Sequence, residues 1–109
     1  MLETTTLTAA IRQQRVLADV AQERDFQDRK WGPQDHTPLE WLSILGEEYG
    51  EACQAANKAY WGGKPWAAYR AELVQVAAVA VAMIENLDQR ERDNRPYEAG
   101  GYYAQEAQS

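Results

Sequence analysis

The feature that most restricts the fold is the segment 73–84, LVQVAAVAVAMI, in which Gln75 is the only polar residue. A helix that is apolar almost all round is buried on several faces. A single domain of 109 residues with three helices can hardly cover such a helix by itself. We therefore expect a homo-oligomer with this segment near the interface. The segment is shorter than the roughly 20 residues of a membrane-spanning helix, so no membrane partner is expected.

The remaining pattern predicts an all-α chain, because strand-like alternation is nearly absent and apolar residues recur at helical spacing. The second helix has clear end signals. Thr37 is a favourable N-cap, Pro38 suits the first helical position and Glu40 completes a capping box. Gly62 and Gly63 are typical of a helix C-terminus, so they mark its end.

Three main helices follow from these boundaries. The first is expected over Thr8–Arg29 and the third over Trp66–Arg90, with helix-breaking residues in the connector 30–38. Residues 1–92 are thus predicted to form one helical bundle, and 93–109 a C-terminal tail with little regular structure that is loosely held or docks through its tyrosines. The candidate core positions of the first two helices are Ile11, Leu17, Val20, Phe26, Trp41, Leu42, Leu45, Tyr49, Ala52, Cys53, Ala56 and Tyr60.

The charge balance narrows the classes of partner. The formal net charge is −6, which argues against unaided binding to a nucleic acid polymer or an anionic membrane. A phosphate-bearing ligand would need a cation as mediator. Cys53 is the only cysteine, so no disulfide forms within the chain, and the N-terminal stretch lacks a signal-peptide pattern. We therefore expect a cytoplasmic protein.

Three carboxylates lie close together in the second predicted helix, within the stretch LGEEYGEACQA. Glu47, Glu48 and Glu51 border the apolar stripe of this helix when the chain is placed at 3.6 residues per turn. Like charges at this spacing repel along a helix face. The cluster is either a solvated face or a site that requires negative charge.

A fourth carboxylate, Glu72, precedes the apolar segment of the third helix and shares its sector with valines, while Gln75 follows one turn later. An acid in an apolar sector is rarely buried without a partner. Arg70 or Lys58 could pair with Glu72. Alternatively, if the helices pack antiparallel, the acids converge, and two carboxylates about 6 Å apart repel by roughly 3 kcal/mol. A compensating cation held by oxygen ligands alone would be Mg²⁺ or Mn²⁺ rather than zinc.

The order of these residues resembles a known motif. EEYGE at 47–51, followed after a gap by ELVQ at 72–75, is similar to the EExxE–spacer–ExxD metal motif of the all-α MazG-like nucleotide pyrophosphohydrolases. The stretches 29–51 and 70–85 also resemble the short MazG-like proteins of bacteria and their phages. The resemblance covers roughly residues 22–88.

This resemblance implies a helical bundle that forms a homodimer or homotetramer. It implies Mg²⁺-dependent hydrolysis of a nucleoside triphosphate, an NTP or dNTP, to the monophosphate and pyrophosphate. Glu48, Glu51 and Glu72 would be metal ligands, and Glu47 would be a further ligand or would orient the attacking water, so Glu47 and Glu48 are the expected catalytic residues. Gln75 occupies the ligand position of the family's last acid, and an amide carries less charge.

The connector before the second helix offers residues for a nucleotide. Lys30 is expected to meet a phosphate, Trp31 to stack on a base, and Gln34 or His36 to hydrogen-bond the base edge. The alternative is that Trp31 is a core aromatic residue and that Lys30 and His36 are solvated.

Two other functions stay open from the sequence. A catalytically weakened nucleotide-binding or interaction module on the same fold is one of them, and Gln75 is its motivation. A structural helical oligomer, whose acids only keep the surface soluble, is the other.

Overall fold

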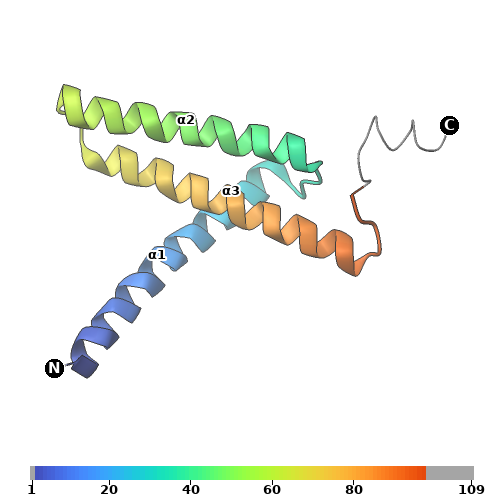
Figure 1. Ribbon diagram of the computed structural model, residues 1–109, viewed down its shortest axis with the longest axis horizontal. Helices are drawn as coiled ribbons and strands as arrows, with labels where there is room; N and C mark the ends of the chain where they lie inside the picture. The colour runs from blue at the N-terminus through green and yellow to red at the C-terminus, as the bar shows by residue number, and fades with distance from the viewer. Residues whose placement is uncertain (1, 98–109) are drawn as a thin grey trace.

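A computed structural model describes residues 2–97, with side chains from residue 6 onward. Figure 1 shows three helices: α1 (Leu2–Trp31), α2 (Pro38–Gly62) and α3 (Trp66–Arg92). Residues 2–97 contain no β-strand. The prediction of an all-α chain with three main helices is therefore confirmed for this part of the chain.

The ends of α2 form as the sequence predicts. The Glu40 backbone N–H donates to Thr37 Oγ1 over 3.3 Å, and the Thr37 N–H donates to Glu40 Oε1 over 3.1 Å, which together make a capping box. At the other end Gly63 has φ of 68° and its N–H reaches the carbonyl of Lys58. Glycine adopts this left-handed conformation without steric cost, so it ends the helix.

The outer helices are longer than the sequence pattern indicated. α1 begins six residues before Thr8 and continues to Trp31, where Gly32 with φ of 71° turns the chain. α3 continues two residues beyond Arg90 before the chain leaves the helix at Asp93. Helix ends fray and their sequence signals are weak, so a sequence locates such boundaries only to within a few residues.

The three helices do not pack as a closed bundle. Figure 1 shows α2 and α3 side by side and antiparallel, while α1 crosses α3 and its N-terminal half projects away from the other two. α3 contacts both α1 and α2, whereas the backbones of α1 and α2 do not touch over the described residues. The Cα radius of gyration is 18.4 Å. A compact domain of this length has a radius of gyration of about 13 Å.

The core of the single chain is consequently thin. No large side chain of the described residues is wholly buried, and Val20, Ala78 and Val79 are the buried apolar residues of α1 and α3. In the apolar segment of α3, Leu73 and Ile84 remain 42% and 59% exposed. The buried apolar residues of α2 are Trp41, Ala52 and Ala59.

Several predicted core positions are wrong for the single chain. Ile11, Leu17 and Phe26 of α1 are about half exposed, because α1 meets α3 with only part of its length. Cys53 is exposed as well. The other exposed members of the predicted core are Leu42, Tyr49 and Tyr60.

α3 is also long and apolar enough to cross a membrane when length and composition alone are considered. This is a weak indication, because the core helix of a soluble protein satisfies the same criterion. The segment 73–84 is too short on its own, but the helix that contains it is not. The absence of a membrane partner therefore stays a prediction.

Candidate functional site

Three carboxylates from two helices meet where α2 and α3 pack. Glu48 and Glu51 come from α2 and Glu72 from α3, and one oxygen atom of each lies within 4.8 Å of the other two. Residues 48 and 51 are nearly one turn apart, so they share a face of α2, and the antiparallel arrangement brings residue 72 opposite them. We call these three residues the carboxylate triad.

The triad is electrostatically uncompensated. The Oε2 atoms of Glu48 and Glu72 are buried and have no hydrogen-bond partner. Burial raises the pKa of the Glu48 carboxyl, and the charges of Glu51 and Glu72 raise it further. Burial likewise raises the pKa of Glu72, and both the charge of Glu51 and a side-chain hydrogen bond with Glu51 raise it further. Nearby like charges and desolvation both disfavour the ionised form, so protons or a cation would stabilise Glu48 and Glu72, whereas Glu51 is exposed to solvent.

The basic residues that could have neutralised Glu72 do not do so. Arg70, one of the two candidates, donates instead to Asp19 of α1 over 2.7 Å. Lys58, the other candidate, forms no ion pair among the described residues, and neither does any carboxylate of the triad. A purely ion-paired structural role is therefore not what the geometry favours.

Glu47 and Gln75 stand at the margin of the triad. Glu47 is exposed and lies outside the group of three, although its charge is among those that raise the pKa of Glu48. Gln75 is half-buried and follows Glu72 by nearly one turn of α3. An amide oxygen at this place can serve a hard cation as a neutral ligand.

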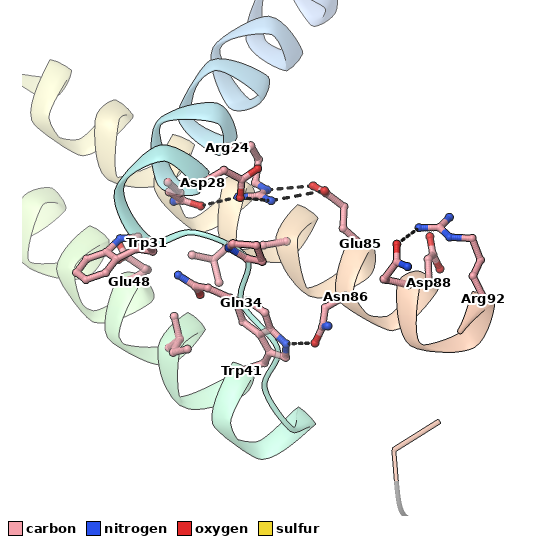
Figure 2. A pocket seen from close by; sticks show the side chains of 16 residues that line it. Arg24, Asp28, Trp31, Gln34, Trp41, Glu48, Glu85, Asn86, Asp88 and Arg92 are labelled. Carbon is pink, nitrogen blue, oxygen red and sulfur yellow. Dashed lines mark hydrogen bonds and ion pairs between the residues drawn. The ribbon is translucent and has the colours of Figure 1, made fainter. Parts of the chain in front are cut away.

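Beside the triad lies a cleft of about 570 Å³ at the crossing of the three helices. Figure 2 shows Trp31 and Gln34 on one wall of this cleft, close to Glu48. The Trp31 side chain is 62% exposed, so an aromatic face is available to a ligand. The other lining residues are Arg24, Gln27, Asp28, Pro33, Trp41, Ile44, Val79, Ala82, Glu85, Asn86, Asp88, Gln89 and Arg92.

The structure does not bring the other two connector residues into the cleft. The ammonium of Lys30 lies 4.9 Å from the centre of the Trp31 ring, and Lys30 does not line the cleft. His36 packs edge-on against Trp41 with ring centres 4.7 Å apart, and its Nδ1 is 3.9 Å from Glu40 Oε2. Of the four predicted nucleotide-binding residues, Trp31 and Gln34 share the cleft with Glu48.

A second polar cluster, which the sequence analysis missed, lies at the far end of α3. The Oδ1 atom of Asn86 accepts hydrogen bonds from Trp41 Nε1 at 2.8 Å, from the Tyr97 hydroxyl at 2.6 Å and from the His36 backbone N–H at 3.4 Å. Its Nδ2 donates to Asp35 Oδ1 over 3.0 Å. Asn86 is buried, and both ends of its amide are satisfied.

Asp35 extends this cluster to the surface. It accepts from Arg90 Nε over 2.8 Å and from Arg95 over 3.4 Å. The hydrogen bonds from Asn86 and Arg90 lower the pKa of Asp35 from its usual 3.8 to about 2. We call Asn86, Asp35 and their partners the asparagine network. It fixes the connector and Tyr97 to α3. Residues 98–109 of the predicted tail lie outside the described part of the chain.

The sequence analysis also did not identify two charged residues of α1 that lie at the triad or at the cleft beside it. Glu23 of α1 lies close enough for its charge to raise the pKa of Glu48. Arg24 donates to Glu85 across the cleft over 3.0 Å, as Figure 2 shows. Both residues belong to the most irregular helical pattern of the chain, and no spacing rule relates α1 to α2.

No family model, no curated protein and no solved structure matches this chain.

Proposed function

We propose that this protein is a MazG-like nucleoside triphosphate pyrophosphohydrolase that depends on Mg²⁺ or Mn²⁺. The observation that carries the proposal is the carboxylate triad, with its two buried oxygen atoms that lack any hydrogen-bond partner. Buried carboxylates are normally paired or coordinate a metal. The spacing of the three residues is also that of the motif that this sequence resembles.

The donor set suits a hard divalent cation. The triad offers only carboxylate oxygens, and Gln75 adds an amide oxygen on the same helix as Glu72. Such a cation would supply Lewis-acid chemistry to a phosphate group and to a water molecule. Glu48, Glu51 and Glu72 would hold it, while Glu47 at the margin would orient the water or accept its proton.

The reaction follows from this arrangement. The water oxygen forms a bond to the α-phosphorus, the bond from that phosphorus to the α–β bridging oxygen breaks, and pyrophosphate leaves with the bridging oxygen. The first cleft receives the nucleoside. Trp31 stacks on the base and Gln34 hydrogen-bonds its edge, beside Glu48 of the triad. Lys30 and His36 have no part in this proposal, because neither lines the cleft.

The active form is a homo-oligomer, a dimer or a tetramer. Two observations support this part of the proposal. The radius of gyration is 18.4 Å, and large apolar side chains such as Leu17, Phe26 and Leu87 are more than half exposed. Large apolar side chains that a single chain leaves uncovered are often buried between the subunits of an oligomer.

The test is a panel of NTPs and dNTPs with Mg²⁺ or Mn²⁺, in which pyrophosphate and orthophosphate are measured separately. We expect pyrophosphate. Glu48→Gln and Glu72→Gln should each abolish its release, whereas Glu91→Gln, an exposed acid at the far end of α3, should leave it unchanged. Full activity in either triad variant would remove the metal role.

A second function is favoured by one residue. Gln75 stands where the resembled motif has an acid, and loss of that charge weakens metal binding. The chain would then be a catalytically weakened nucleotide-binding or interaction module. Calorimetric binding of a nucleotide without product would support this function, and turnover gained by Gln75→Asp would trace the loss to this position.

A further inference from the structure

A second cleft, of about 560 Å³, opens on the other side of the carboxylate triad. It is lined by the last turns of α2, by the hinge between α2 and α3, and by the first turns of α3. Glu51 and Glu72 form one end of it, and Lys58 and Lys64 belong to the same lining. The proposed function leaves this cleft unused.

The two clefts share the triad between them. Glu48 lines the first cleft, with Trp31 and Gln34, whereas Glu51 and Glu72 line the second. A ligand that reached from one cleft to the other would pass over the three carboxylates. Its aromatic end would lie toward the connector, and its other end would lie toward the hinge.

The C-terminal cap of α2 fixes the backbone of both lysines at the end of the helix, while their side chains are exposed. The backbone N–H of Lys64 donates to the carbonyl of Lys58 over 3.1 Å, and the N–H of Gly63 bonds to the same carbonyl. Lys58 follows Glu51 by seven residues, which is a rise of about 10 Å along a helix. A lysine side chain spans roughly 6 Å of that distance, so its ammonium can approach a phosphate chain that extends from the triad.

Neither lysine is occupied elsewhere in the described part of the chain. None of the ion pairs found over these residues involves Lys58 or Lys64, although the chain as a whole is acidic. A polyanion that approaches three carboxylates is repelled unless positive charge stands nearby. The second cleft holds such charge at its hinge end, next to the place where a cation is proposed.

We propose that Lys58 and Lys64 form a subsite for a diphosphate group, which receives the two terminal phosphates of the substrate and then the pyrophosphate product. This inference rests on the proposed function, because it takes the triad as the place where the phosphate chain is cleaved. It fixes the direction of the substrate: the nucleoside lies in the first cleft and the terminal phosphates lie toward the hinge.

The test uses inorganic pyrophosphate with Mg²⁺ as the probe, on the full chain. Calorimetry should show that K58Q/K64Q binds pyrophosphate roughly tenfold more weakly than the unmodified protein, because two charge-assisted hydrogen bonds are lost. Inhibition of NTP hydrolysis by added pyrophosphate should weaken by a similar factor. K58R/K64R keeps both charges and should retain most of the affinity.

Two controls separate the subsite from general charge and folding effects. R12Q/R15Q removes the same number of positive charges from exposed positions on α1 that do not line the second cleft, and should leave pyrophosphate binding unchanged. Both lysines are exposed, so K58Q/K64Q should keep the helical circular dichroism and melting temperature of the unmodified chain.

The outcomes distinguish the two proposals. Equal pyrophosphate affinity in K58Q/K64Q and in the unmodified chain would overturn the subsite, even if NTP hydrolysis proceeds. Failure of the unmodified chain to bind pyrophosphate would overturn it as well. Loss of pyrophosphate binding in K58Q/K64Q, in a protein that hydrolyses no nucleotide, would support the subsite and remove the hydrolase.

Discussion

The carboxylate triad and the asparagine network are both polar groups set between helices, yet they are built in opposite ways. In the asparagine network every buried atom of the Asn86 amide has a partner, and the negative charge of Asp35 meets Arg90 and Arg95. In the triad two buried oxygens have no partner. Buried polar groups are satisfied as a rule, so the exception indicates a role outside the fold.

The two clusters therefore affect the stability of this small chain in opposite directions. The asparagine network joins the connector, Trp41 and Tyr97 to the end of α3, so its contribution is to stability. The triad places like charges side by side, which destabilises the folded chain unless protons or a cation neutralise them. A chain that keeps such an arrangement gives up stability at the place where it would act.

The largest change in stability is expected when the asparagine network is broken. Asn86→Ala leaves the buried Trp41 Nε1–H and the Tyr97 hydroxyl without their acceptor. The free energy of unfolding should fall by about 3 kcal/mol in urea denaturation. Asn57→Ala, at an exposed position of α2, is the matched control and should change it little. Equal effects of the two substitutions would mean that the network is not structural.

The next effect concerns the unsatisfied cluster and its cation. Mg²⁺ or Mn²⁺ at 10 to 100 times its dissociation constant should raise the free energy of unfolding by about 1.4 to 2.7 kcal/mol, because the ion binds the folded chain alone. Glu72→Gln should remove this gain, and Asn86→Ala should keep it on a less stable background. Thermal unfolding with and without the ion measures both. A gain that survives in Glu72→Gln would place the ion elsewhere.

Without divalent ions, the same triad should respond to substitution in the opposite direction from Asn86. Glu48→Gln removes one of several neighbouring negative charges. We expect a stability increase of roughly 1 kcal/mol in the presence of EDTA, after screening by solvent. Glu91→Gln should show no increase. A stability loss in Glu48→Gln would show that the carboxylate is satisfied in the folded chain.

The smallest effect is a pair of opposed pH dependences. The pKa values of Glu48 and Glu72 are raised above the usual 4.5, so the folded state binds protons more tightly and stability rises as pH falls through the raised pKa toward 4.5. The pKa of Asp35 is lowered to about 2, so its contribution is present above 3.8 and is lost as pH falls toward 2.

Denaturation curves across this range, with chelator present, measure the two slopes. Glu48→Gln should flatten the slope of stability against pH above 4.5, and Asp35→Asn should flatten the slope below 3.8. A single slope, unaffected by either substitution, would contradict the assignment of opposite shifts to the two clusters.

Local signals made much of the fold predictable. The capping box of Thr37 and Glu40 and the left-handed Gly63 depend on residues within a few positions of each other, and the sequence shows them directly. The approach of Glu72 to Glu48 and Glu51 required one assumption, which was that the helices on either side of a short glycine hinge pack antiparallel. The resemblance to a known motif pointed to the same residues.

The remainder depended on distant contacts. Helical spacing predicts that Phe26 lies in a core, but it shows only that an apolar stripe exists and not whether a partner covers that stripe. Asn86 stands among apolar and charged residues near the end of α3 and has no feature that marks it as buried. Glu23 faces Glu48 only because α1 crosses α3 where it does, and that crossing has no local signature.

The thin core has a consequence for the life of this protein in a cell. If the chain forms the homo-oligomer proposed above, its exposed apolar surface is covered only when copies meet, so the amount synthesised would help to decide how much of it is folded. Scarce, newly made copies would be open to proteases, and abundant ones would be protected by mass action. Expression level would thereby set the fraction of the chain that is assembled and protected.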